Sequence, residues 1–98
     1  MPYEIIFEPD AIDHLRVFSA RDRATVFEKV EEQLSYEPGK ETRHRKRLRP
    51  NPLAPWEVRI GTLRVVYDLN EEASEGRIVA VGRKRGDRLF IAGQEFLL

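Results

Sequence analysis

The sequence predicts an α+β domain in which a helical hairpin packs on a small, largely antiparallel sheet. Three observations support this prediction. A β-branched and aromatic segment opens the chain, two segments of helical periodicity follow it, and strand-like segments fill the second half. The 98 residues are expected to form one domain, 1–98, because they leave no room for a second.

The chain opens with a predicted strand and a short predicted helix. Residues 3–8, YEIIFE, have the composition of a strand, and Pro9 is expected to end it. Asp10 is expected to cap a helix that extends through Phe18. This helix would direct four apolar side chains inward: Ala11, Ile12, Leu15 and Phe18.

A second helix is predicted after Ser19, which stands three residues before Asp22 in an arrangement similar to a capping box. Pro38 and Gly39 are expected to end it after Tyr36. Its inward stripe is predicted to consist of Ala24, Phe27, Val30 and Leu34. Because neither helix could bury its apolar stripe alone, we expect the two to pack as a hairpin on one sheet face.

The central feature of the sheet is a β-hairpin over residues 56–68, WEVRIGTLRVVYD. The pair Gly61-Thr62 suits a two-residue type II′ turn. That turn pairs Ile60 with Leu63, Arg59 with Arg64, and Val58 with Val65. Two arginines then face each other across the strands, which weakens a sheet but suits a polyanionic partner. A longer turn would shift the register.

The remaining strands are predicted from the C-terminal third of the chain. Residues 70–76 form an acidic turn, and residues 77–85, RIVAVGRKR, have the pattern of a central strand that runs from the core to a charged rim. Residues 88–98 are too apolar for a disordered tail and could form either a short helix or a strand.

The charge of the chain is unevenly distributed, although its formal net value is zero. Residues 1–42 hold ten acidic and five basic side chains, whereas residues 43–98 hold seven acidic and twelve basic ones. We therefore expect the second half to build a basic surface. No signal peptide or transmembrane segment is evident, so we expect a cytoplasmic protein without membrane contact.

Several kinds of catalytic site are unsupported by the sequence. The chain has no cysteine, which excludes disulfides and thiolate nucleophiles. His14 is expected on a helix surface and His44 lies in a charge run, so neither indicates a catalytic triad. No motif has metal-ligand or phosphate-loop spacing, and we therefore expect neither a metal nor a cofactor.

Arginine and lysine are the available functional groups, and they come from separate stretches of the chain. The first stretch, Lys40–Arg49, contains Arg43, Arg45, Lys46, Arg47 and Arg49 and could contact RNA or serve as a solvated connector. The second set, from the hairpin and the last long strand, comprises Arg59, Arg64, Arg83, Lys84 and Arg85. Converging guanidinium groups could bind phosphate or stabilise a pentavalent phosphate.

The chain resembles the RelE/ParE superfamily of type II toxins over nearly its whole length. The resemblance rests on KRLRPNPLAPWEVRIGTLRVVYDL (residues 46–69) and IVAVGRKRGDRLF (residues 78–90), together with the opening YEIIFEPDAIDHL and the ending RLFIAGQEFLL. It implies a RelE-like fold, in which the helical hairpin packs on a curved sheet. RelE-type members cleave mRNA in the ribosomal A site without a metal, by attack of a 2′-OH on the adjacent phosphate. ParE-type members inhibit DNA gyrase.

The resemblance also implies partners and roles. A small cognate antitoxin would bind the toxin and provide the only link to DNA. Arg64 matches the arginine that contacts the scissile phosphate, Arg59 matches a catalytic lysine, and Arg83 with Lys84 matches a basic pair. Glu57 replaces a second lysine and Phe90 replaces a catalytic tyrosine.

Two functions follow from this match. The first is a ribosome-dependent endoribonuclease whose catalytic set is Arg59, Arg64, Arg83, Lys84 and Arg85. The alternative is a degenerate or ParE-like module that binds protein and has no nuclease activity. Antitoxin binding could use apolar residues near the C-terminus, which could equally form ordinary core packing: Leu89, Phe90, Ile91, Phe96 and Leu97.

Overall fold

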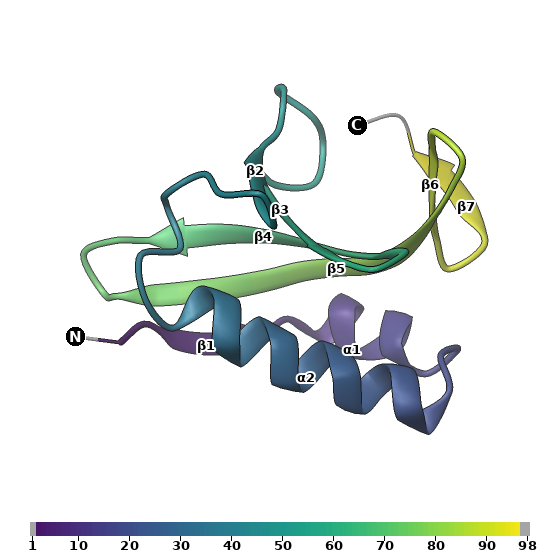
Figure 1. The fold of residues 1–98 in the computed structure, drawn as a ribbon, viewed down its shortest axis with the longest axis horizontal. Coiled ribbons are helices and arrows are strands. Elements are labelled where there is room, and N and C mark those ends of the chain that lie inside the picture. The colour runs from purple at the N-terminus through teal and green to yellow at the C-terminus, as the bar shows by residue number, and fades with distance from the viewer. Residues whose placement is uncertain (1, 97–98) are drawn as a thin grey trace.

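The computed structural model describes residues 2–96 and confirms the α+β prediction (Figure 1). Two helices lie against one face of a curved seven-stranded sheet. In chain order the elements are β1 (Glu4–Phe7), α1 (Pro9–Leu15), α2 (Ala20–Leu34), β2 (Arg45–Arg47), β3 (Trp56–Ile60), β4 (Leu63–Asn70), β5 (Glu75–Arg85), β6 (Arg88–Ile91) and β7 (Gln94–Phe96).

The sheet is built around the long strand β5. Strands β2 to β7 follow one another across the sheet in sequence order, each antiparallel to the next. β1 pairs in parallel with the first part of β5, and β6 pairs with its last part. The predicted hairpin register is confirmed, since Arg59 lies opposite Arg64 and Gly61 adopts a positive φ of 59°.

The main core lies between the helices and the sheet, but the helix stripes differ from the prediction. In α2 the buried side chains are Val26, Val30 and Leu34, while Ala24 and Phe27 are exposed. The prediction is confirmed for Val30 and Leu34 and was wrong for Ala24 and Phe27, a difference that corresponds to a rotation of the helix about its axis. Residues 26 and 27 both stand at helical spacing from residue 30, so periodicity alone could not choose between them.

The first helix begins earlier and ends earlier than predicted. Pro9 is its first residue and Glu8 occupies the N-cap position, a placement that suits proline because the first helical turn needs no N–H donor there. Ile12 is exposed rather than inward. In α2, the Ser19 cap is confirmed, because its hydroxyl oxygen accepts a hydrogen bond from the Asp22 amide.

His14 was predicted to lie on the helix surface, and this prediction was wrong. The side chain is half-buried, and its Nδ1 atom accepts a hydrogen bond of 3.3 Å from the backbone amide of Val81. The β4–β5 register shifts between Val66 and Tyr67, leaving Val79 as an extra residue in β5. His14 thus joins α1 to β5 close to this bulge.

The sheet face turned away from the helices, called the open face below, is the concave side of the curved sheet (Figure 1). Two features rise beside it: the proline-rich loop between β2 and β3, and the β6–β7 hairpin. This hairpin shows that residues 88–96, for which a short helix or a strand was predicted, form strands. A second apolar cluster lies here: Ala54, Val66, Ala80, Leu89 and Ile91. A Cβ atom at Gly82 would lie 2.5 Å from the Phe90 carbonyl oxygen, so only glycine allows β6 to approach this closely.

Part of the basic run forms an edge strand that was not predicted. β2 pairs with β3 and places Arg45 opposite Val58 and Arg47 opposite Trp56. Arg45 is buried, which corrects the alternative that the whole run is a solvated connector. In residues 2–96 no helix combines the length and apolar character needed to cross a membrane.

Candidate active site

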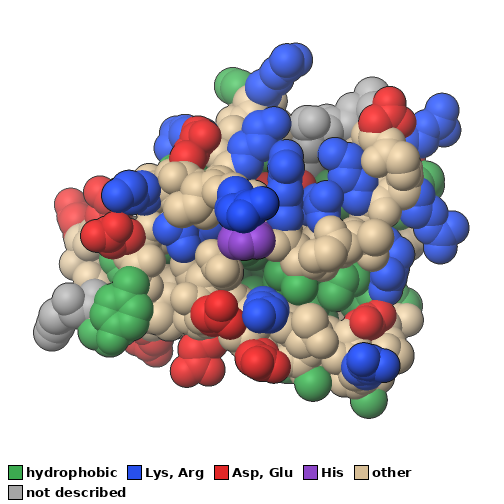
Figure 2. Space-filling model, viewed as in Figure 1, with side chains coloured by type: hydrophobic (Ala, Val, Ile, Leu, Met, Phe, Trp, Pro, Cys, Tyr) green, Lys and Arg blue, Asp and Glu red, His purple; other side chains and the backbone are tan. Residues whose placement is uncertain are grey.

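Three basic side chains from three adjacent strands share the open face. Arg59 of β3 lies opposite Arg64 of β4, and Arg64 lies opposite Gly82 of β5. Lys84 stands two residues beyond Gly82 and therefore lies on the same side of the sheet. Figure 2 shows Lys and Arg side chains gathered on the half of the surface built by the strands and their loops. We call Arg59, Arg64 and Lys84 the basic triad.

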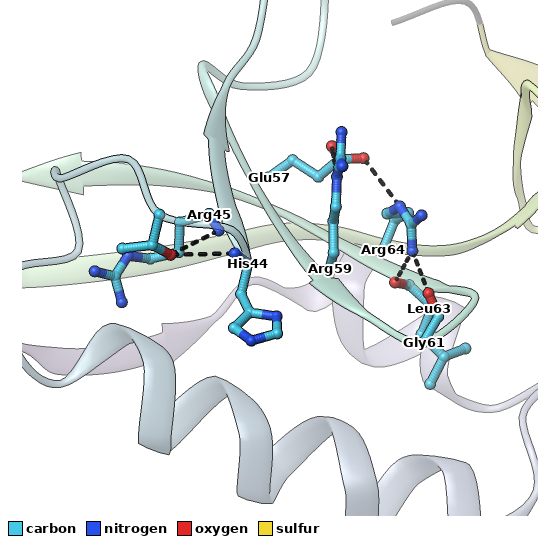
Figure 3. A network of polar contacts seen from close by, with 8 residues as sticks. His44, Arg45, Glu57, Arg59, Gly61, Leu63 and Arg64 are labelled. Carbon is cyan, nitrogen blue, oxygen red and sulfur yellow. Dashed lines mark hydrogen bonds and ion pairs between the residues drawn. The ribbon is translucent and has the colours of Figure 1, made fainter.

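A carboxylate separates the two arginines of the basic triad (Figure 3). Glu57 Oε1 lies 3.6 Å from Arg64 Nε, and Glu57 Oε2 lies 3.7 Å from Arg59 Nε. Glu57 is only 7% exposed, although it is ionisable. The two distances fit ion pairs and exceed the range of good hydrogen bonds. The open face therefore presents two guanidinium groups bridged by one internal anion.

Arg64 is the most enclosed member of the basic triad. Its Nη1 atom donates to the carbonyl oxygens of Gly61, at 2.6 Å, and Leu63, at 2.8 Å. Burial lowers the pKa of the Arg64 guanidinium; Glu57 acts in the opposite direction, and Arg59 adds to the lowering. Arg64 is held in place by its own hairpin and stays positively charged at neutral pH.

Two donor atoms of the pair remain without hydrogen bonds. Within residues 2–96, Arg59 Nε and Arg64 Nε are the buried side-chain nitrogen or oxygen atoms that lack a hydrogen-bond partner. Buried donors of this kind are rare and costly in folded proteins. Both donors belong to neighbouring guanidinium groups on the open face, where they could accept a further hydrogen-bond partner.

The structure does not bring Arg83 and Arg85 to the basic triad. Arg83 faces the helices, where its Nη2 atom lies 2.7 Å from Asp22 Oδ2 and its Nη1 atom donates to Thr62 Oγ1 at 2.9 Å. Arg85 is exposed, and its guanidinium lies 6.0 Å from the centre of the Phe90 ring. Of the predicted basic pair at the end of β5, only Lys84 joins Arg59 and Arg64.

Of the five residues predicted to contact RNA, one is buried and four are exposed. Arg45 is buried and donates to the carbonyl oxygens of Gln33, at 2.7 Å, and Lys40, at 3.0 Å. Arg47 lies 5.6 Å from the centre of the Trp56 ring. The four that are exposed to solvent are Arg43, Lys46, Arg47 and Arg49.

Neither Phe90 nor Tyr67 supplies a hydroxyl to the open face; Phe90 lies opposite Arg83 and therefore on the other side of the sheet from Lys84. Phe90 has no hydroxyl, and Tyr67 points to the same side, where its hydroxyl donates to the Pro38 carbonyl oxygen at 2.8 Å. Burial raises the pKa of Tyr67, and nearby Arg45 offsets part of that rise. The basic triad can therefore stabilise negative charge, but this tyrosine cannot transfer a proton there.

The apolar residues predicted for antitoxin binding lie mostly in the β6–β7 hairpin. Leu89 and Ile91 are buried in the second cluster, and Phe90 and Phe96 are half-buried. Leu97 lies outside the described residues. Burial of Leu89 and Ile91 agrees with ordinary core packing of these two side chains.

Two parts of the site were not anticipated. The bridging position of Glu57 depends on side-chain conformation, although the predicted register already placed this residue on the same face as Arg59. The enclosure by β6 was signalled only by Gly82, an isolated glycine within a strand, which is typical of a close backbone approach.

Comparison with known proteins identifies the fold. No protein-family model and no curated protein matches the chain. A chain of the toxin–antitoxin complex RelBE2 from Mycobacterium tuberculosis is similar, with 30% identity over 86% of this chain and 93% of that one, and a TM-score of 0.74. The archaeal RelE–RelB complex from Pyrococcus horikoshii has the same fold, with 20% identity over 88% of this chain and 98% of that one, and a TM-score of 0.66. The chain therefore belongs to the RelE-like toxins of the RelE/ParE superfamily.

Proposed function

We propose that this protein is the toxin of a type II toxin–antitoxin system and cleaves mRNA at the ribosome as a metal-independent endoribonuclease. The observation that supports this best is the basic triad: three cations from adjacent strands on a face that the helices leave open. Guanidinium and ammonium groups so arranged match the charge of a phosphodiester.

In the proposed reaction, the ribose 2′-oxygen attacks the adjacent phosphorus. The 2′-hydroxyl gives up its proton to solvent as the 2′-O–P bond forms. The P–O5′ bond breaks, the departing 5′-oxygen takes a proton from Lys84 or solvent, and the products carry a 2′,3′-cyclic phosphate and a 5′-hydroxyl. Negative charge grows on the non-bridging oxygens in the transition state. Arg59 and Arg64 would stabilise that charge, and Lys84 would lie near the departing 5′-oxygen.

The partners proposed for this chain are a cognate antitoxin, mRNA and the ribosome. Both similar structures are toxin–antitoxin complexes, which supports an antitoxin. The exposed basic side chains at and beside β2 (Arg43, Lys46, Arg47 and Arg49) would contact RNA backbone. DNA would be reached only through the antitoxin, and the site of action would be cytoplasmic.

A purified translation system tests this function directly. Primer extension on the translated mRNA should reveal new 5′ ends at A-site codons when the protein is added. The variant Arg64→Ala should lower the cleavage rate by at least about 100-fold, because it removes the central charge of the triad. Arg16→Ala provides a matched control, since Arg16 follows α1 directly and its side chain is 77% exposed. Intact mRNA in the presence of folded wild-type protein and active ribosomes would exclude the nuclease function.

Two observations favour a second candidate, a protein-binding module without nuclease activity. Glu57 partly neutralises the arginines, and Phe90 offers no hydroxyl. RNA binding through the triad and β2 should weaken steeply as salt rises, because counterions are released when phosphates are contacted. A response to salt that stays flat would favour the protein-binding module.

A further inference from the structure

The Glu57 carboxylate occupies the position of an anion between the two arginines of the basic triad. Its two oxygen atoms face different guanidinium groups, one on the same strand and one on the next (Figure 3). A phosphodiester also presents two oxygens that share one negative charge. The internal carboxylate and an external phosphate would therefore compete for the same two cations.

The Glu57 carboxylate is close enough to both guanidinium groups for electrostatic attraction, but no hydrogen bond to either one fixes it in place. Both Glu57 distances exceed 3.5 Å, and within residues 2–96 no hydrogen bond is donated to the Glu57 side chain. The two Nε donors are likewise unsatisfied. A structural buried ion pair would need such hydrogen bonds to offset the loss of hydration. An entering phosphate could satisfy these donors better than the carboxylate does.

A displaced carboxylate would have a second partner available. Lys46 of β2 lies directly opposite Glu57 in the β2–β3 register and is exposed. Cross-strand partners share a sheet face, so rotation of the Glu57 side chain toward the sheet edge would exchange two guanidinium groups for one ammonium group.

We propose that Glu57 is a specificity-determining residue of the phosphate site, an internal anion that a substrate phosphodiester must displace. Small free anions would gain little from this exchange, because they bring no other contacts. An RNA strand that also contacts the exposed basic side chains beside β2 would have the additional affinity needed for displacement. The identification of the ligand as RNA rests on the proposed function.

The test measures binding of a short fluorescent RNA whose riboses carry 2′-O-methyl groups, so that it cannot be cleaved. Glu57→Gln should tighten binding by about fivefold at low salt and make the salt slope steeper by about 0.7, the value for one more phosphate contact on a single strand. Glu72→Gln is the matched control, because it changes the net charge equally at an exposed turn residue. It should alter the affinity by less than about twofold.

A double variant separates local competition from general electrostatics. In an Arg64→Ala background, the gain from Glu57→Gln should be clearly smaller, because only Arg59 of the two arginines that Glu57 contacts remains to be freed. Unchanged or weaker binding by folded Glu57→Gln protein, or an equal gain from Glu72→Gln, would overturn the proposal.

Two further controls keep the outcome decisive. If Glu57→Gln does not fold, Glu57→Asp should show a smaller gain, since the shorter side chain withdraws from at least one guanidinium. No gain by folded Glu57→Asp would then overturn the proposal. Because binding is measured without ribosomes, a failed cleavage assay alongside tighter Glu57→Gln binding would reject the nuclease function and leave the anion exchange standing.

Discussion

Two pairs of arginines lie on opposite faces of the sheet and differ in how they are held. On the helix-covered face, Arg45 and Arg83 hold the two ends of α2. Arg45 donates to the Gln33 carbonyl near the C-terminus, and Arg83 binds Asp22 in the first turn. On the open face, Arg59 and Arg64 meet only at Glu57 and leave their Nε atoms unsatisfied.

This difference separates arginines that hold the fold from arginines available to a ligand. Helix ends carry unpaired carbonyl and amide groups, so charged side chains placed there form short, fixed bonds. Arg45 bonds such a group, the Gln33 carbonyl, at 2.7 Å, and Arg83 binds the side-chain carboxylate of Asp22 in the first turn at the same distance. No helix covers the open-face pair: Arg64 is fixed by the Gly61 and Leu63 carbonyl groups of its own hairpin, whereas the contacts of Arg59 and Arg64 with Glu57 are longer, at 3.7 and 3.6 Å. Stability and RNA affinity should therefore depend on different arginines.

The largest expected effect on stability comes from Arg45→Met. The substitution removes three hydrogen bonds from the Arg45 side chain and takes this partner from the Gln33 and Lys40 carbonyl groups. We expect a loss of about 3 kcal/mol in the free energy of unfolding, measured by urea denaturation. Arg43→Met is the matched control, because Arg43 is exposed two residues away, and it should cost less than about 0.5 kcal/mol. Equal stability of the two variants would refute the structural role of Arg45.

A smaller effect is expected at the other end of α2. The Arg83–Asp22 pair is short, but both side chains are about one third exposed, so solvent screens the attraction. Arg83→Met should cost about 1 kcal/mol in the free energy of unfolding, and Asp22→Asn a similar amount. The double variant should cost clearly less than the sum, because both substitutions break one contact. Strict additivity would show that Arg83 is free, as a site residue would be.

The sequence was sufficient to place Arg59 and Arg64 together. The Gly61-Thr62 turn determines the register, and strand alternation then puts both arginines and Glu57 on one face. Sequence also identified Ser19 as a helix cap, because the capping hydroxyl acts locally. These successes depend on contacts between residues close in the chain.

The errors involve contacts between distant elements. Arg83 was grouped with Arg64 because both are basic and lie on neighbouring strands. Strand alternation puts Arg83 on the helix-covered face, although its sequence neighbour Lys84 lies on the open face. Nothing near Arg45 in the sequence shows that α2 ends with an unpaired carbonyl group within its reach. The rotation of α2 about its axis, which its packing on the sheet sets, likewise decides that Val26 rather than Phe27 is buried.

The measurement that tests the central claim most directly is an NMR titration of the labelled protein with the same 2′-O-methyl RNA. Arginine Nε–H signals report each guanidinium separately. The signals of Arg59 and Arg64 should shift as RNA is added, with changes at Lys84 on the same face, while those of Arg45 and Arg83 should stay in place. Shifts confined to Arg83 and the helices, with Arg59 and Arg64 unmoved, would contradict the assignment of RNA binding to the open face.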